Sequence, residues 1–309
     1  MAKTILFIHG RSFKPAKPAL SRLWKDATRY GIERSFSRKV GAFDAAKKVF
    51  VYYGDISNDY LRRLGRKYNE RKDVEDRKHV LEVLKTYTSR QFTKARYDKL
   101  PGKTPLKEFF ADTLSGPLKW FGLSEKAIAS VAPDMREYWN PDSQFGSDVR
   151  WPFTEALRRA MDGKDQILVV AHSLGTMIAW DTFWKFSYYG EYQRYRGRRV
   201  DLWITLGSPL ADETVKAHLK GAGARGSRQF PANIVHWENV AAEDDYISHD
   251  QTVRNDFKRA LRYPKKLAFR SIQDHRIYNL TVRREESNPH SSLGYLVHPK
   301  TAELIGKWL

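Results

Sequence analysis

The chain contains no cysteine in its 309 residues, which excludes disulfide bonds, cysteine-ligated metals and a cysteine nucleophile. Long apolar runs are also missing, since no stretch approaches the ~18 consecutive apolar residues needed to span a bilayer. The short apolar run at 5–8 leads into His9-Gly10 and not into a small-residue cleavage site, so it does not resemble a signal peptide. We therefore expect no membrane span, and the cytoplasm is the default location.

Positive charge is in excess. The chain has 55 Lys and Arg against 36 Asp and Glu, which gives a formal net charge of +19. The excess is spread over several segments, whereas residues 233–253 are rich in acid. Such a field attracts anionic membranes, nucleic acids and acidic substrates without specificity. We favour a solubilising surface, with peripheral contact to an anionic membrane left open. No nucleic-acid-binding module is recognisable, so no specific nucleic acid partner is expected.

Short apolar runs alternate with longer helical patterns, which is typical of a mainly parallel sheet flanked by helices. The runs are rich in Ile, Val, Leu and aromatic residues, as strands buried on both faces should be. They lie at 4–9, 49–53, 167–171, 202–206, 234–240 and 278–282. The pattern predicts an α/β fold in one domain, 1–309, because α/β chains of this size often form one domain.

Residues 57–146 interrupt this alternation and contain no convincing strand. The part at 59–87 has leucine and valine at helical spacing among many charges and predicts amphipathic helices. The part at 103–131 adds phenylalanine, leucine and tryptophan between proline and glycine breaks. We expect a helical insertion that either covers the site as a lid or cap or shields one edge of the sheet.

The strongest chemical signal is Ala171-His172-Ser173-Leu174-Gly175, which directly follows the apolar run at 167–171. A serine on a sharp turn from strand to helix needs small residues two positions before and after it, because larger side chains would collide across the turn. Ala171 and Gly175 meet that need. The residues at 176–185 predict a buried helix whose positive N-terminal end faces Ser173. Ser173 is therefore the candidate nucleophile.

The second signal is His9-Gly10-Arg11, immediately after the first predicted strand. In a hydrolase with such a turn, one oxyanion-hole amide comes from the residue after the nucleophile and the other from a loop after an earlier strand. The backbone amides of Leu174 and Arg11 are the candidate pair. We interpret His9 as a residue that supports this loop through hydrogen bonds.

The chain order expected for such a site is serine, acid, histidine. After the predicted strand at 234–240 comes Glu243-Asp244-Asp245, where a carboxylate in a loop could orient a histidine. Asp245 is the candidate acid and Asp244 the reserve.

Of the later histidines, His290 follows the last predicted strand and precedes the last predicted helix at 300–309, where the base is expected. His249 is too near Asp245 in sequence. His275 precedes the last predicted strand and His298 opens the last helix; both remain alternatives.

These motifs, with Thr205-Leu206-Gly207-Ser208-Pro209, Trp237-Glu238-Asn239 and Gly294-Tyr295, resemble α/β-hydrolases of the lipase and esterase type. The likeness is greatest to the lipase-like group that includes deacylases of glycosylphosphatidylinositol anchors, and it spans nearly the whole chain apart from 57–146. The chain departs from the pattern in Ala171, where a glycine is common, in its single oxyanion-loop glycine, and in Asp245-Tyr246-Ile247, where relatives tend to have Asp-Pro-Val. The resemblance implies carboxylic-ester hydrolysis on an α/β-hydrolase fold.

The expected activity is therefore that of a serine esterase or lipase acting through Ser173, Asp245 and His290, with His9, Gly10, His172 and Gly175 in support. Such chemistry requires no metal or organic cofactor. An ester substrate is the expected ligand, and the aromatic insertion favours one of lipid character. An acyltransferase is the alternative within enzymes, and a non-catalytic ligand-binding protein on the same fold is the alternative outside them.

Overall fold

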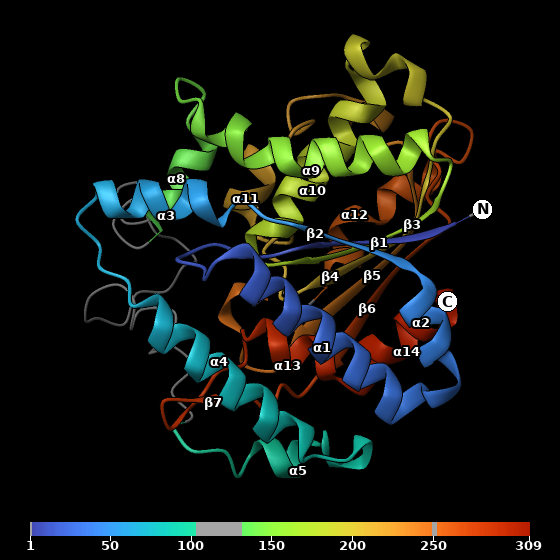
Figure 1. Ribbon diagram of the computed structural model, residues 1–309. Helices are drawn as coiled ribbons and strands as arrows, with labels where there is room; N and C mark the ends of the chain where they lie inside the picture. Colours follow the sequence, from blue (N-terminus) through green and yellow to red (C-terminus); the bar gives the residue numbers. More distant parts are fainter. Residues whose placement is uncertain (1, 103–131, 249–251) are drawn as a thin grey trace.

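The computed structural model describes residues 2–102, 132–248 and 252–309. Its centre is a six-stranded sheet in the order β2-β1-β3-β4-β5-β6, in which all neighbouring strands pair in parallel (Figure 1). The strands are β1 (Lys3–Ile8), β2 (Lys47–Val51), β3 (Gln166–His172), β4 (Val200–Leu206), β5 (Ile234–Ala242) and β6 (Ser271–Ile277). The parallel sheet with flanking helices confirms the predicted α/β fold.

Five of the six predicted strands coincide with β1 to β5, but the last prediction is wrong. The sixth strand is Ser271–Ile277, whereas 278–281 form a loop and Val282–Arg283 (β7) pairs antiparallel with Glu286–Ser287 (β8). The sixth strand is an edge strand with only two buried residues, Ile272 and Ile277. Because an edge strand faces water, its sequence can be polar, and no apolar run marks it.

Helices cover both faces of the sheet (Figure 1). One layer holds α1 (Lys17–Phe36), α2 (Val40–Ala45), α4 (Glu70–Lys85), α13 (Ser292–Val297) and α14 (Pro299–Trp308). The other holds α3 (Gly54–Arg63), α8 (Pro133–Trp139), α9 (Phe145–Asp162), α10 (Leu174–Tyr188), α11 (Glu213–His218) and α12 (Val253–Phe257). Shorter turns are α5 (Lys94–Tyr97) and the 3-10 segments η1 (Ser37–Lys39), η2 (Ser89–Gln91), η3 (Gly190–Tyr195), η4 (Gly226–Gln229), η5 (Tyr246–Ser248) and η6 (Lys258–Arg262).

Two hydrophobic cores follow from this arrangement, one on each face. Successive strand side chains point to opposite faces; thus Leu6 and Ile8 of β1 join the core under α9 and α10, while Ile5 and Phe7 join the core under α1 and α13. The predicted helix at 176–185 is confirmed as α10, whose residues are nearly all buried.

The predicted insertion is helical where the structure describes it. The helices predicted at 59–87 are confirmed as α3 and α4, and α4 packs against α1 and α13. The lid predicted at 103–131 lies outside the described residues, so the choice between a lid and an edge shield stays a prediction.

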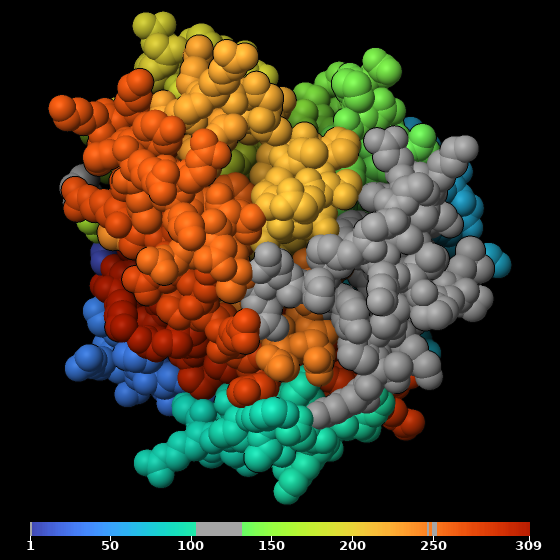
Figure 2. Space-filling model, turned by 180° about the vertical axis from the view of Figure 1, so that it is seen from behind, coloured from blue at the N-terminus to red at the C-terminus, as the bar shows by residue number. Residues whose placement is uncertain are grey.

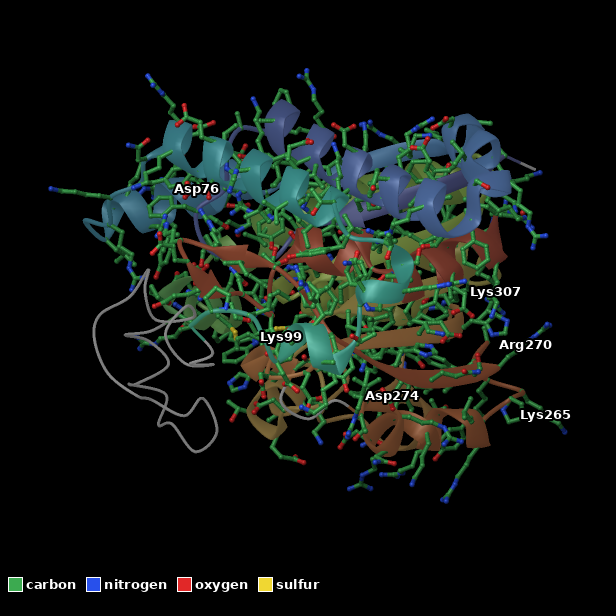
Figure 3. The ribbon with its side chains drawn as sticks, turned by 90° about the horizontal axis from the view of Figure 1, so that it is seen from below. Asp76, Lys99, Lys265, Arg270, Asp274 and Lys307 are labelled. Atoms are coloured by element: carbon green, nitrogen blue, oxygen red, sulfur yellow. The ribbon has the colours of Figure 1, made fainter. Side chains whose placement is uncertain are left out.

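Charged side chains lie at both ends of the molecule (Figure 3). Figure 3 shows Lys265, Arg270 and Lys307 toward one end and Asp76 toward the other. The space-filling view from behind shows α5 and its flanking residues (teal) along the lower edge and the β5–β6 region (orange) over a large part of the face (Figure 2). In the described ranges, no helix combines the length and the apolar character that a bilayer span requires.

Candidate active site

Ser173 lies where β3 ends and α10 begins, on a strained backbone. Its φ of 53° and ψ of −127° fall in a region that non-glycine residues rarely occupy. The backbone holds this turn through hydrogen bonds, with Ser173 N donating to the Leu206 carbonyl at 3.1 Å and Thr176 Oγ1 donating to the Ser173 carbonyl at 2.7 Å. The strain indicates a position that the surrounding structure enforces.

Two glycines make this turn sterically feasible. A Cβ on Gly175 would lie 2.5 Å from the His9 carbonyl oxygen, so the first turn of α10 packs against the end of β1 without room for a side chain. A Cβ on Gly10 would lie 2.7 Å from Cβ of Ser173. The loop after β1 therefore approaches Ser173 closely, as an oxyanion-hole loop must.

Asp245 and His290 form a hydrogen-bonded pair. Nδ1 of His290 lies 2.9 Å from Oδ2 and 3.0 Å from Oδ1 of Asp245. The Asp245 side chain is fully buried, while that of His290 is 28% exposed. Since an ionised carboxylate only accepts hydrogen bonds, Nδ1 carries the proton and Nε2 is left as the basic nitrogen. The acid and the histidine come from loops after β5 and after β8.

Further donors fix the Asp245 carboxylate. Tyr295, on α13, donates from its hydroxyl to Oδ2 at 2.6 Å, and the backbone N–H of Ile247 donates to Oδ1 at 3.0 Å. The Tyr295 hydroxyl accepts in turn from the N–H of Ala242 at 2.8 Å. Burial, followed by the nearby Asp245 charge, raises the pKa of Tyr295 well above its usual value, so the phenol stays a donor.

The reserve acid lines the same cavity but does not contact His290, and the described alternative histidines have other partners. Asp244 is exposed and accepts a hydrogen bond from the Tyr97 hydroxyl at 3.0 Å. His275 belongs to β6, where Nε2 lies 2.6 Å from Glu238. His298 caps α14 by accepting from Lys300 N at 3.0 Å, which confirms that it opens the last helix. His249 lies outside the described residues.

His9 is buried and neutral, and its hydrogen bonds hold the loop after β1. Nδ1 donates to the Gly10 carbonyl at 2.8 Å, and Nε2 accepts from Tyr53 N at 3.3 Å. Its ring stacks on Tyr53 with centroids 4.0 Å apart. Burial, then repulsion from Lys14, lowers the pKa of His9 to about 3. The placement is that of a supporting residue.

The side chain of Arg11 is committed to a buried ion pair. Its Nε and Nη2 lie 2.9 and 2.8 Å from Asp134 Oδ1, and Oδ2 of the same carboxylate accepts from Ser12 N at 3.0 Å. Lys14 donates from Nζ to the carbonyls of Arg11, Ser12 and Phe13. Burial, then the charge of Arg77, lowers the pKa of Lys14 to about 7. Asp134 and Lys14 thus both hold the candidate oxyanion loop, one through the Arg11 side chain and the Ser12 amide, the other through the loop carbonyls.

His172 lies beside His290. Its Nε2 is 2.9 Å from the His290 carbonyl oxygen, and the two ring centroids are 4.6 Å apart. Burial, followed by repulsion from His290, lowers the pKa of His172 well below its usual value. A neutral His172 fixes the backbone of His290 and adds no positive charge next to it.

Ser173, Asp245 and His290 line one cavity of about 450 Å³. Gly207, with a φ of +52°, packs directly against the acid and the histidine. A Cβ at this position would lie 2.8 Å from Asp245 Oδ2 and 3.0 Å from His290 Nδ1, so no side chain fits there. In the described part of the chain, no hydrogen bond joins the Ser173 hydroxyl to His290. Eight of the predicted site residues line this cavity: His9, Gly10, Arg11, His172, Ser173, Asp244, Asp245 and His290. Leu174 and Gly175, which were also predicted, do not line it.

The sequence motifs did not indicate that Asp134, Lys14 and Gly207 contribute to the site. Tyr295 was part of one motif, but its contact with Asp245 was not predicted. A glycine before Ser208-Pro209 was the one available signal for Gly207.

The described residues contain no group of His, Asp and Glu able to hold a metal ion. Comparison with known protein families and with curated proteins finds no match to this chain.

Proposed function

We propose that the protein is a serine hydrolase of the α/β-hydrolase fold that cleaves carboxylic esters. The observation that carries the proposal is the Asp245–His290 pair, which opens on the same cavity as Ser173 on its strained turn. The order Ser173, Asp245, His290 along the chain and the loops that supply them are those of this class of enzyme.

In the proposed reaction, Ser173 Oγ attacks the ester carbonyl while His290 Nε2 takes its proton. Asp245 holds the opposite ring nitrogen and stabilises the imidazolium that forms. The backbone amides of Arg11 and Leu174 are the proposed donors to the oxyanion. His290 then gives its proton to the leaving alcohol, and an acyl-enzyme remains. Water, activated by His290, releases the carboxylic acid and regenerates Ser173.

The geometry of the site is compatible with this sequence of steps. Catalytic hydrogen bonds are often long or poorly aligned before substrate binds, so the missing bond between Ser173 and His290 is expected to form when substrate is bound. The neutral state of His172 supports the proposal too, because a second cation beside His290 would oppose its protonation.

A fluorophosphonate probe tests the proposal, because it reacts only with an activated serine. We expect mass spectrometry to place the label on Ser173 and Ser173→Ala to lose both labelling and p-nitrophenyl butyrate cleavage. Ser187→Ala is the matched control, because Ser187 lies on the same helix and bonds only within the protein scaffold. A folded wild-type protein that takes up no label and cleaves no ester would refute the proposal.

A further inference from the structure

The candidate catalytic cavity has a strongly basic wall. Eight Lys and Arg side chains line it, against the three carboxylates Asp73, Asp244 and Asp245. The cations come from three segments far apart in the sequence: the loop after β1, the segment from 66 to 77 that includes the start of α4, and the β7–β8 hairpin. Cations that converge on one concave surface create a positive potential that attracts anions to it.

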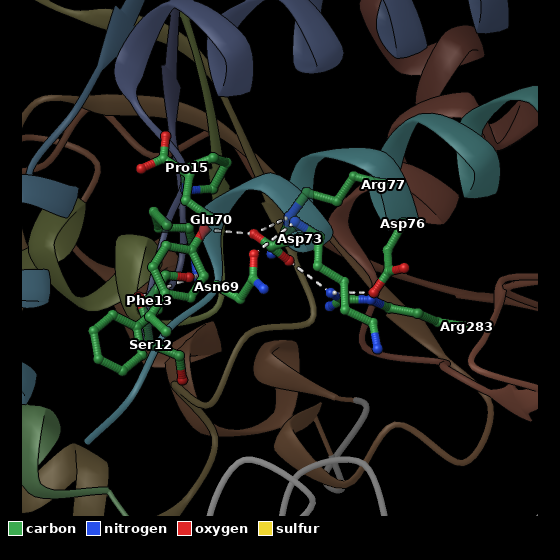
Figure 4. A network of polar contacts seen from close by, with 12 residues as sticks. Ser12, Phe13, Pro15, Asn69, Glu70, Asp73, Asp76, Arg77 and Arg283 are labelled. Atoms are coloured by element: carbon green, nitrogen blue, oxygen red, sulfur yellow. Dashed lines mark hydrogen bonds and ion pairs between the residues drawn. The ribbon is translucent and has the colours of Figure 1, made fainter.

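The carboxylates at this wall are already engaged. Asp73 is buried and accepts from Tyr68 at 2.8 Å, Arg77 at 2.9 Å and Arg283 at 2.6 Å (Figure 4). Asp76 stands 3.4 Å from both Arg283 and Arg284. Burial alone would raise the pKa of Asp73, but its ion pairs outweigh burial and lower it to about 2.

Positive charge remains after these pairings. Lys67 and Lys72 line the cavity, are exposed, and form no ion pair within the described ranges. Arg283 also has an unsatisfied donor, because its Nε is buried and has no hydrogen-bond partner among the described residues. One carboxylate network therefore positions Arg283, while the two lysines at the rim are not neutralised.

The backbone of the hairpin adds a second observation. Its two-residue loop is Arg284-Glu285, and both residues have positive φ, 52° and 65°. Such a loop prefers Asn-Gly, because other side chains strain it. This loop places Arg284 at the cavity wall, 3.4 Å from its ion-pair partner Asp76, so both arginines of the hairpin line the cavity.

We propose that the substrate is a carboxylic ester that carries a phosphate group, and that Lys67, Lys72 and the arginines of the β7–β8 hairpin bind this phosphate while Ser173 attacks the ester. This inference rests on the proposed hydrolase function. The phosphate is bound and not transformed. A water-soluble phosphorylated ester and a phospholipid headgroup share this chemistry, and the experiment separates them.

Phosphate binding is measured first, in a variant that cannot cleave esters, so that the result does not depend on catalysis. Inorganic phosphate and glycerol 3-phosphate are titrated calorimetrically into Ser173→Ala, alone and combined with Lys67→Gln/Lys72→Gln. We expect the lysine substitutions to weaken binding at least fivefold. The control pair Lys47→Gln/Lys78→Gln removes two exposed lysines outside the cavity and should leave binding unchanged. Absent binding, or equal weakening by both pairs, would overturn the inference.

Turnover is then compared for 1-butyrylglycerol with and without a 3-phosphate. We expect kcat/KM to be at least tenfold higher for the phosphorylated ester and this preference to vanish in Lys67→Gln/Lys72→Gln. A long-chain analogue in vesicles tests the lipid source. Equal rates on both esters would overturn the phosphate subsite and leave the hydrolase proposal intact. Phosphate binding without any ester cleavage or probe labelling would refute the hydrolase proposal and leave a phosphate-binding site.

Discussion

The hydroxyl of Tyr295 donates a 2.6 Å hydrogen bond to the carboxylate of Asp245, which also receives Nδ1 of His290. Tyr295 therefore positions the acid of the proposed triad without touching substrate. We expect Tyr295→Phe to lower kcat/KM for ester cleavage roughly threefold to tenfold, the effect of one lost hydrogen bond. It should also lower the free energy of unfolding by ~1–3 kcal/mol, because the N–H of Ala242 loses its buried acceptor.

Tyr188→Phe is the control for this change. Its hydroxyl donates to the carbonyls of Ser227 and Phe230, away from the cavity. Steady-state kinetics and urea unfolding should show a loss of stability without a loss of kcat/KM. If both variants lose activity in proportion to stability, Tyr295 has no positioning role.

Asp245 and Asp244 are adjacent in sequence but lie in different surroundings. Asp245→Asn should lower kcat on the order of 10³- to 10⁴-fold, because an amide no longer stabilises the protonated histidine or its tautomer. Asp244→Asn removes a charge that contacts Tyr97 and not His290, keeps an oxygen that can accept from the Tyr97 hydroxyl, and should keep nearly full activity. Kinetics with p-nitrophenyl butyrate check this prediction, and a larger loss in Asp244→Asn would contradict the assignment of the acid.

Gly207 has no room for a side chain beside the acid and the histidine. Gly207→Ala would place Cβ 2.8 Å from Asp245 Oδ2 at a positive φ of +52°, so we expect loss of most ester cleavage and a stability cost of ~1–3 kcal/mol. Gly41→Ala is the opposite case, since nothing lies within 4 Å of its Cβ in helix α2. It should stabilise the protein by ~0.5–1 kcal/mol and leave kcat unchanged.

The turn at Ser173 could be predicted because its signal is local. A buried strand, small residues around Ser173 and an apolar helix follow one another within about twenty residues, and each constraint is steric. Five strands could be predicted for a similar reason, since burial on both faces requires continuous apolar runs. The edge strand β6 lacks that requirement, so the nearby apolar run at 278–282 predicts a strand several residues too late in the chain.

The surroundings of the site could not be predicted, because they depend on contacts between distant segments. Arg283 meets Asp73 across 210 positions, and Arg11 meets Asp134 across 123. In the sequence, Asp73 is one of many charges on an amphipathic helix, and no local pattern marks it as the centre of an ion-pair network. The choice between Asp244 and Asp245 likewise depends on which carboxylate the loop turns toward His290.

Asp73 should make stability depend on pH in acid. Its ion pairs lower its pKa to about 2 in the folded state, from 3.8. Its contribution is therefore complete above about pH 4 and is lost as the pH falls toward 2; it amounts to roughly 2 kcal/mol, of which about 1 is lost by pH 3. Urea unfolding at pH 5 and pH 3 should show this loss in the wild type and its absence in Asp73→Asn. The exposed Asp59→Asn should behave like the wild type.

The hairpin loop Arg284-Glu285 gives a prediction of opposite sign, a gain in stability. Both residues occupy positive φ, which a glycine adopts without the strain that Cβ imposes. Glu285→Gly should therefore raise the free energy of unfolding by about 1 kcal/mol, although the greater freedom of glycine in the unfolded chain offsets part of the gain. Because Glu285 does not line the cavity, phosphate binding and ester cleavage should stay within twofold of the wild type. Thermal unfolding and calorimetry check both outcomes, and a fall in the melting temperature would show that the hairpin is not strained.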